Sequence, residues 1–115
     1  MKSLNELTKR IVDFRDARDW KQFHNAKDLA ISLVLEAGEV MEHFQWKNKE
    51  EMDKYIVEHK EEVGDELADV LYWVLLMSHD LNIDVVKSFE KKMEKNEQKY
   101  SVEKAKGKHT KYNKL

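Results

Sequence analysis

The chain has 115 residues, of which 41% are hydrophobic and 38% charged, and its formal net charge is −2. This length provides one domain, and the apolar content indicates a globular chain. Proline and cysteine are absent and glycine occurs three times, which favours helices and excludes disulfides and thiolate metal sites.

The first predicted helix is amphipathic and ends near Arg18. Ser3 followed three residues later by Glu6 is a capping-box pattern that marks its start. Apolar residues then recur at steps of three and four, the spacing of one helix face. They are Leu4, Leu7, Ile11 and Phe14. Residues 19–25 are polar and aromatic without a period, so we expect a loop there.

The second predicted helix runs from a cap at Asn25 to about Trp46 and is apolar nearly all round. Its apolar residues are Leu29, Ala30, Ile31, Leu33, Val34, Leu35, Ala37, Val40, Met41 and Phe44. A helix of this kind is buried on most sides, so we expect part of its surface to lie against another subunit.

A third helical region begins at the capping pattern of Asn48 and Glu51. A break near His59 is compatible with its apolar pattern. Residues 80–82 end the region, because Asn82 tolerates left-handed backbone angles.

The fourth helix is capped by Asp84 and ends near Tyr100. Helices joined by short connections pack antiparallel, so we predict an all-α four-helix bundle. Residues 1–103 are expected to form a single domain, and residues 104–115 a basic tail that is partly ordered at most.

Two acidic pairs lie within the most apolar helices, and a three-residue step places both members of each pair on one helix face. They are Glu36 with Glu39 and Glu66 with Asp69. Carboxylates in apolar surroundings are costly unless they are paired or bind a metal. If the two helices pack side by side, four carboxylates converge and offer only oxygen ligands, which suits Mg²⁺ or Mn²⁺. One pair alone is usually solvated surface, but two pairs in apolar helices favour a metal site.

Charge is unevenly distributed along the chain. Residues 1–83 carry 11 Lys and Arg against 18 Asp and Glu, a net charge of −7. Residues 84–115 carry 10 Lys against 5 Asp and Glu, a net charge of +5. This division fits a metal site beside a phosphate-binding segment, although charge alone favours two solvated faces of opposite sign.

The two acidic pairs, with their spacing, resemble the metal-binding signature of the MazG family of nucleotide pyrophosphohydrolases. The resemblance covers roughly residues 4–112 and is nearest to the dCTP pyrophosphatase branch. Its other segments are Arg18-Asp19-Trp20-x-Gln22-Phe23-His24, Phe44-Gln45-Trp46-Lys47, Lys92-Met93-x-x-Asn96-x-x-x-Tyr100 and Lys111-Tyr112.

This resemblance implies a helical bundle assembled as a homodimer or as a dimer of dimers, a homotetramer, with sites between helices and across subunits. It implies that Mg²⁺ is bound, and catalysis carried out, by Glu36, Glu39, Glu66 and Asp69. Water would attack the α-phosphorus of a (d)NTP, such as dCTP or a related pyrimidine nucleotide, and pyrophosphate would leave. Metal ions suit this reaction because they neutralise the triphosphate and lower the pKa of a bound water.

The resemblance also implies a set of substrate-binding residues. They are Trp20, His24, Trp46, Trp73, Lys92, Asn96 and Tyr100. Trp20 and Trp46 would stack on the base, and Lys92 and Asn96, one helical turn apart, would face the phosphates and sugar. Without the resemblance, these tryptophans would be ascribed to the core and Lys92 to ordinary surface.

Two positions depart from the dCTP pyrophosphatase branch. Ile11 stands where that branch has a histidine, and Trp73 stands where it has a tyrosine. Both positions lie near the nucleotide in relatives, so the preference for base and sugar is left open. Other branches of the family carry an acidic residue at the position of Leu35.

A second hypothesis is a catalytically silent helical module that binds nucleotides or acts as a scaffold, because fold does not dictate function. The intact acidic positions argue against it. Nucleic-acid binding through the lysine-rich C-terminal third is a weaker hypothesis, because the acidic body would repel a long polyanion. The N-terminus lacks the apolar core of a secretory signal and no apolar run could span a membrane, so a cytoplasmic protein is expected.

Overall fold

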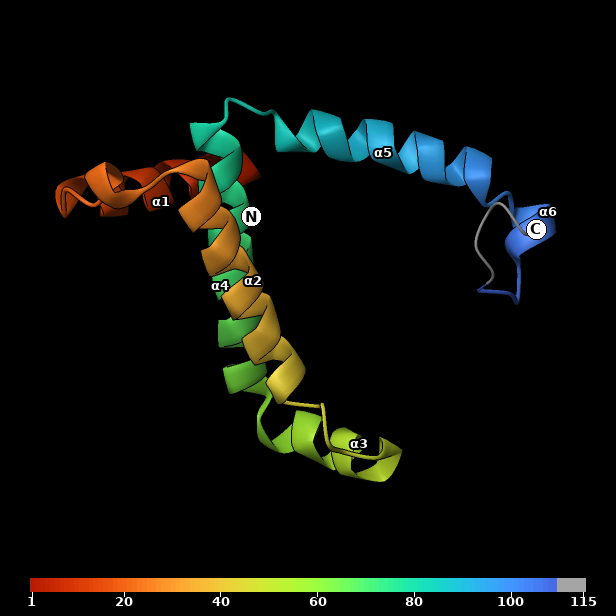
Figure 1. The fold of residues 1–115 in the computed structure, drawn as a ribbon. Coiled ribbons are helices and arrows are strands. Elements are labelled where there is room, and N and C mark those ends of the chain that lie inside the picture. The colour runs from red at the N-terminus through yellow and green to blue at the C-terminus, as the bar shows by residue number, and fades with distance from the viewer. Residues whose placement is uncertain (110–115) are drawn as a thin grey trace. The chain divides into compact units, whose positions relative to one another are not determined.

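The structure is a computed structural model that describes residues 1–109. Secondary structure in this range is entirely helical, which confirms the all-α class. The helices are α1 (Leu4–Ala17), the 3₁₀ turn η1 (Lys21–Phe23), α2 (Ala26–Glu42), α3 (Lys49–Glu58), α4 (Lys60–Asp80), α5 (Val85–Lys99) and α6 (Val102–Ala105) (Figure 1). The expected Lys111-Tyr112 segment lies outside the described residues. No helix within residues 1–109 is both long enough and apolar enough to cross a membrane.

The chain divides into two units, Met1–Asn82 and Ile83–Leu115. In the first unit, α4 packs along α2, and it also contacts α1 and α3. Figure 1 shows α2 and α4 side by side. This pairing positions the acidic residues of both helices. That residues 1–103 act as one domain stays a prediction.

The helix boundaries follow from local signals in the sequence. The backbone N–H of Glu6 donates to Ser3 Oγ at 3.2 Å, and the Ser3 N–H donates to Glu6 Oε1 at 3.4 Å, which completes the expected capping box. His59 separates α3 from α4. After α4, Asn82 adopts a positive φ of 54°, which Asn tolerates better than most residues.

Helix α2 ends at Glu42 rather than near Trp46. The backbone N–H groups of His43 and Phe44 donate to carbonyl groups three residues earlier, which tightens the chain into turns. Tyr55 of α3 holds this turn, because its hydroxyl lies 2.5 Å from His43 Nδ1 and its ring lies 4.1 Å from Lys47 Nζ.

The core of the first unit is small. Its fully buried apolar side chains are Leu29, Leu75 and Leu76. Much of the apolar surface of α2 stays exposed in the single chain, and Val34 is 68% and Leu35 63% exposed. The expectation that another subunit covers this surface stays a prediction.

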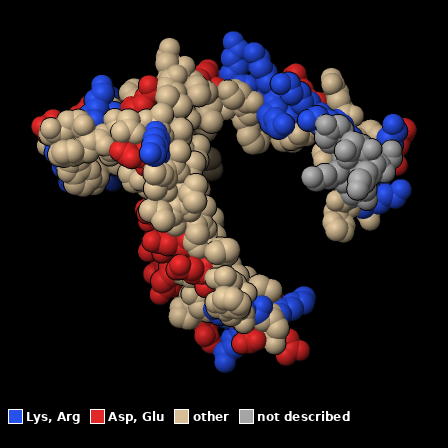
Figure 2. All heavy atoms as spheres, in the orientation of Figure 1, with Lys and Arg blue, Asp and Glu red and all other residues tan. Residues whose placement is uncertain are grey.

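In the second unit, α5 is amphipathic. Val86 and Phe89 are exposed apolar residues of this helix. Figure 2 shows Lys side chains gathered over α5 and acidic side chains gathered along α4. The charge asymmetry of the sequence therefore corresponds to different helices.

Candidate metal centre

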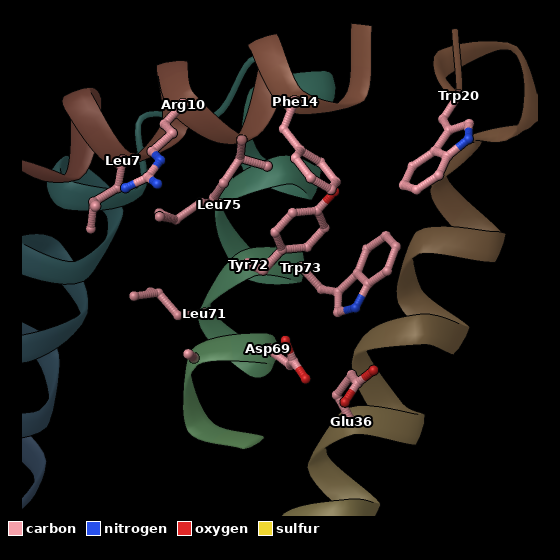
Figure 3. A pocket seen from close by; sticks show the side chains of 12 residues that line it. Leu7, Arg10, Phe14, Trp20, Glu36, Asp69, Leu71, Tyr72, Trp73 and Leu75 are labelled. Atoms are coloured by element: carbon pink, nitrogen blue, oxygen red, sulfur yellow. The ribbon is translucent and has the colours of Figure 1, made fainter. Parts of the chain in front are cut away.

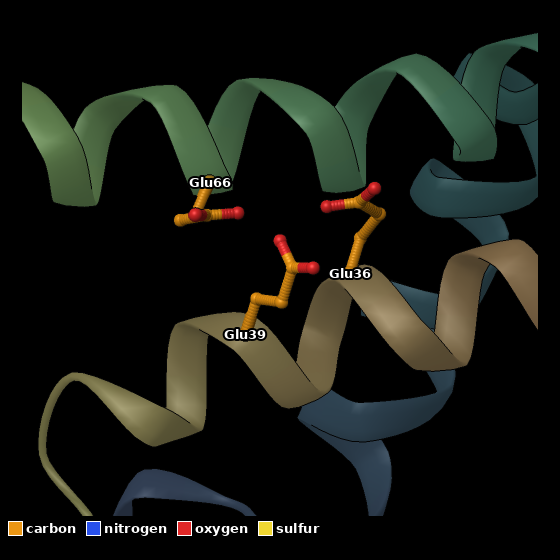
Figure 4. Close-up of side chains that lie close together, drawn as sticks. All are labelled: Glu36, Glu39 and Glu66. Carbon is orange, nitrogen blue, oxygen red and sulfur yellow. The ribbon is translucent and has the colours of Figure 1, made fainter.

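Three carboxylates meet where α2 packs against α4. Glu36 and Glu39 come from α2, and Glu66 comes from α4. One carboxylate oxygen from each residue lies within 4.8 Å of the other two (Figure 4). Glu36 and Glu66 are half-buried, whereas Glu39 is exposed. The three-residue step directs both α2 carboxylates toward the neighbouring helix.

The crowding of these carboxylates disfavours their charged forms. A hydrogen bond with Glu39 raises the pKa of Glu66 to about 7, and burial and repulsion from the neighbouring carboxylates add to this shift. Burial raises the pKa of Glu36, and repulsion from Glu39 acts in the same direction. Within residues 1–109, the Oε2 atoms of Glu36 and Glu66 are buried without a hydrogen-bond partner. A buried carboxylate oxygen without a partner is costly, so a positive charge or a donor at these two oxygens would stabilise the cluster.

A divalent cation fits these observations. The cluster offers only oxygen ligands, the donor set preferred by Mg²⁺ and Mn²⁺. Such an ion would supply the partner for the two buried oxygens and offset the repulsion. Asp69 lies one helical turn after Glu66 and lines the cavity that also contains Glu36, although it is not one of the three clustered residues.

A cavity of about 670 Å³ opens beside the cluster (Figure 3). Glu36 and Asp69 line one end, and the walls are mainly apolar and aromatic residues of α1 and α4, with Trp20 from the loop after α1. This volume is within the range of small-molecule sites, which combine apolar walls with a few polar groups.

The aromatic rings of this cavity pack edge to face. The centroid distances are 5.7 Å for Trp20 and Phe14, 6.4 Å for Phe14 and Tyr72, and 4.9 Å for Tyr72 and Trp73. Trp20 is 42% exposed, so part of its ring is open to a ligand. The cavity therefore offers aromatic surface close to carboxylates.

Sequence reasoning missed two polar residues of the cavity wall, Arg10 and Tyr72. The helical period contained the signal for Arg10. It lies three residues after Leu7 and four before Phe14, both of which also line the cavity. Ile11, singled out as a departure, lines the same cavity.

The remaining predicted substrate-binding residues are His24, Trp46, Lys92, Asn96 and Tyr100. The His24 ring contacts Trp73 edge to face, but it lines a second cavity of about 350 Å³. Trp46 is 86% exposed in the turn after α2 and does not line the cavity beside the cluster. The second unit contains Lys92, Asn96 and Tyr100, with the first two one turn apart on α5 and Tyr100 at its C-terminal cap. Their roles in binding stay predictions.

Carboxylates gathered from two packed helices define a class of helical proteins with an acidic centre. The family model described as MazG-like matches residues 31–115, and the chain belongs to this family. The resemblance seen in the sequence is thereby confirmed.

Curated relatives and a solved structure support this assignment. The chain is 33% identical to dCTP pyrophosphatase 1 of Rattus norvegicus and 30% identical to that of Homo sapiens, each over 98% of this chain and 68% of the relative. The crystal structure of a pyrophosphatase from Archaeoglobus fulgidus DSM 4304 is similar, with a TM-score of 0.82 and 36% identity. This match covers 88% of the present chain and 94% of the other.

Proposed function

We propose that the protein is a Mg²⁺-dependent nucleoside triphosphate pyrophosphohydrolase. It converts a (d)NTP, dCTP or a related pyrimidine nucleotide, to the monophosphate and pyrophosphate, and so removes it from the cytoplasmic nucleotide pool. The observation that carries this proposal is the carboxylate cluster beside a cavity with aromatic walls. The relatives that are dCTP pyrophosphatases add independent support.

The proposed chemistry begins at the acidic cluster. Glu36, Glu39, Glu66 and Asp69 would hold the metal. When bound, Mg²⁺ neutralises the triphosphate and lowers the pKa of a coordinated water. A carboxylate of the cluster accepts the proton of the attacking water. A bond forms between the water oxygen and the α-phosphorus, the bond from that phosphorus to the bridging oxygen breaks, and pyrophosphate leaves.

The cavity would receive the nucleoside. Trp20 and Trp73 present aromatic surface to a flat base, and aromatic stacking contributes roughly 1–3 kcal/mol in nucleic-acid binders. Ile11 supplies an apolar wall where the dCTP pyrophosphatase branch has a histidine. The base is therefore held here more by apolar contact than by hydrogen bonding at that position.

We also propose that the protein works as a homodimer or homotetramer. The exposed apolar side chains of α2 support this, since a partner subunit would remove them from water. In such an assembly, Lys92, Asn96 and Tyr100 contact the phosphates and sugar.

The direct test is a panel of deoxy- and ribonucleoside triphosphates, including modified cytosines, incubated with Mg²⁺ and analysed by chromatography. We expect monophosphate and pyrophosphate as products. Glu66→Gln should lower turnover at least about 100-fold, because even outer-shell partners of metal ligands contribute 10- to 100-fold.

The matched control is Glu61→Gln, which removes an exposed carboxylate from the same helix and should leave turnover unchanged. A panel left intact, or products consisting of diphosphate and phosphate, would contradict the proposal. Nucleotide binding without turnover would favour the silent module.

A further inference from the structure

A charged side chain is buried at the end of the first unit opposite α3. Arg15 of α1 is 1% exposed, and its guanidinium donates to both carboxylate oxygens of Asp80 in α4, at 2.6 and 2.9 Å. Such a forked pair is strongly directional. Replacing a buried ion pair with apolar residues often leaves stability unchanged or higher, so the pair contributes geometry as much as stability.

The same guanidinium also reaches the loop after α1. Arg15 Nη1 lies 3.4 Å from His24 Nδ1. Because arginine only donates hydrogen bonds, a hydrogen bond at this contact has His24 Nδ1 as its acceptor. Arg15 thus ties the loop that carries His24 to the end of α4.

The His24 ring in turn contacts the candidate site. It packs edge to face against Trp73, with a centroid distance of 5.8 Å and an interplanar angle of 70°. Trp73 lines the same cavity as Glu36, and Figure 3 shows its indole nitrogen on the side facing Glu36. Burial raises the pKa of Glu36, and a hydrogen bond from the Trp73 side chain acts in the opposite direction.

We infer that the Arg15–Asp80 pair is a positioning element for the candidate site. It holds His24 so that the His24 ring fixes the Trp73 indole against Glu36. Neither Arg15 nor Asp80 lines the cavity beside the cluster, so both act through other residues. The catalytic meaning of this arrangement rests on the proposed function, whereas the placement of Trp73 is independent of it.

The placement can be measured without nucleotide or metal. The chain has three tryptophans, so Trp20→Phe with Trp46→Phe leaves Trp73 as the only tryptophan, whose emission is excited selectively at wavelengths that tyrosine does not absorb. In this background, Arg15→Met combined with Asp80→Leu removes the ion pair and fills its volume. We expect the Trp73 emission to shift to longer wavelength and its near-ultraviolet circular dichroism to weaken, with helix content retained.

Three further variants define the controls for this experiment. Arg15→Lys keeps the positive charge but loses the paired hydrogen bonds of the guanidinium to both Asp80 oxygens, and we expect a partial shift of the Trp73 emission. Lys9→Met breaks the exposed Lys9–Asp13 pair on the same helix and should leave the Trp73 spectrum unchanged. If the double variant does not fold, His24→Leu keeps the Arg15–Asp80 pair but removes both the contact with Arg15 and the ring contact with Trp73, and it should give the same shift.

Activity supplies the second measurement. In the chain with all three tryptophans, the Arg15→Met and Asp80→Leu double variant should lose about 10-fold in kcat/KM, the lower range for outer-shell partners, with KM raised because Trp73 also lines the proposed base site. A folded double variant, or a His24→Leu variant, with the parental Trp73 spectrum would overturn the inference, even if the parent hydrolyses nucleotides. A parent without hydrolysis would instead contradict the proposed function and leave the spectral result standing.

Discussion

At the scale of single residues, the site depends on carboxylates that repel one another. Glu36 and Glu66 each have a buried oxygen without a hydrogen-bond partner in residues 1–109, and both have raised pKa values for which burial and neighbouring carboxylates are causes. Protons or a divalent cation relieve the same repulsion, so the two should compete for the cluster. This competition makes stability a measure of metal binding.

The metal-free protein should lose stability as the pH rises from about 4.5 to about 7. Glu66 has a pKa of about 7 in the folded chain against an ordinary value of 4.5, so the folded state binds more protons across this range and raising the pH favours unfolding. Thermal unfolding at a series of pH values checks this. Glu66→Gln and added Mg²⁺ should each flatten the slope, whereas Glu61→Gln should not. A metal-free melting temperature that rises with pH through this interval would refute the expectation.

Part of the site could be predicted from the sequence. The helical step placed Glu36 and Glu39 on one face, but the packing of α2 against α4 was a condition of the predicted metal site and became known only from the structure. The contribution of Arg15 was not predicted, because an arginine on an amphipathic helix is ordinarily exposed. Its burial depends on the carboxylate of Asp80, which is 65 positions distant and not foreseeable from local pattern.

At the scale of elements, capping residues determine where most helices begin. The starts of α1 and α3 followed from local signals, because a side chain and a backbone N–H three residues apart suffice to define them. A break near His59 was also expected, although His59 makes no side-chain capping hydrogen bond with α4. The end of α2 could not be predicted from such local signals. Apolar residues continue to Phe44, and the contact between His43 and Tyr55 of α3 fixes a turn there instead.

Asn48→Ala should destabilise the first unit by about 1 kcal/mol, the usual effect of losing an N-cap. The Asn48 side chain accepts from the Glu51 N–H at 2.9 Å, and Glu51 Oε1 accepts from the Asn48 N–H at 3.2 Å. Chemical denaturation measures the change in the free energy of unfolding. Lys54→Ala, which alters an exposed 3.9 Å ion pair on the same helix, should change it by less than about 0.5 kcal/mol. Equal effects of the two substitutions would show that the cap does not stabilise α3.

At the scale of the whole molecule, few apolar side chains of the described chain are fully buried. Leu29, Leu75 and Leu76 form the fully buried apolar core, whereas Val34 and Leu35 remain in contact with solvent. A soluble monomer rarely exposes large apolar patches without a partner for them. The sequence predicted this surface, because α2 has more apolar residues than a single neighbouring helix can cover.

The protein should therefore have a mass in solution of at least twice the 13.8 kDa of one chain. Val34→Glu places a charge on the exposed apolar face and should shift the protein toward the monomer, because burying an unpaired carboxylate is costly. Light scattering coupled to size-exclusion chromatography checks both statements. Glu61→Gln serves as the surface control. A parent protein that is monomeric at all concentrations would contradict the assembly.

We propose that Glu36, Glu39 and Glu66 together form one binding site for a divalent cation. The most direct measurement is isothermal titration of Mn²⁺ into the metal-free protein, compared with Glu66→Gln and Glu61→Gln. We expect saturable binding to the parent and to Glu61→Gln, and affinity weakened at least about 100-fold in Glu66→Gln. Equal Mn²⁺ affinity in the parent and Glu66→Gln would contradict it.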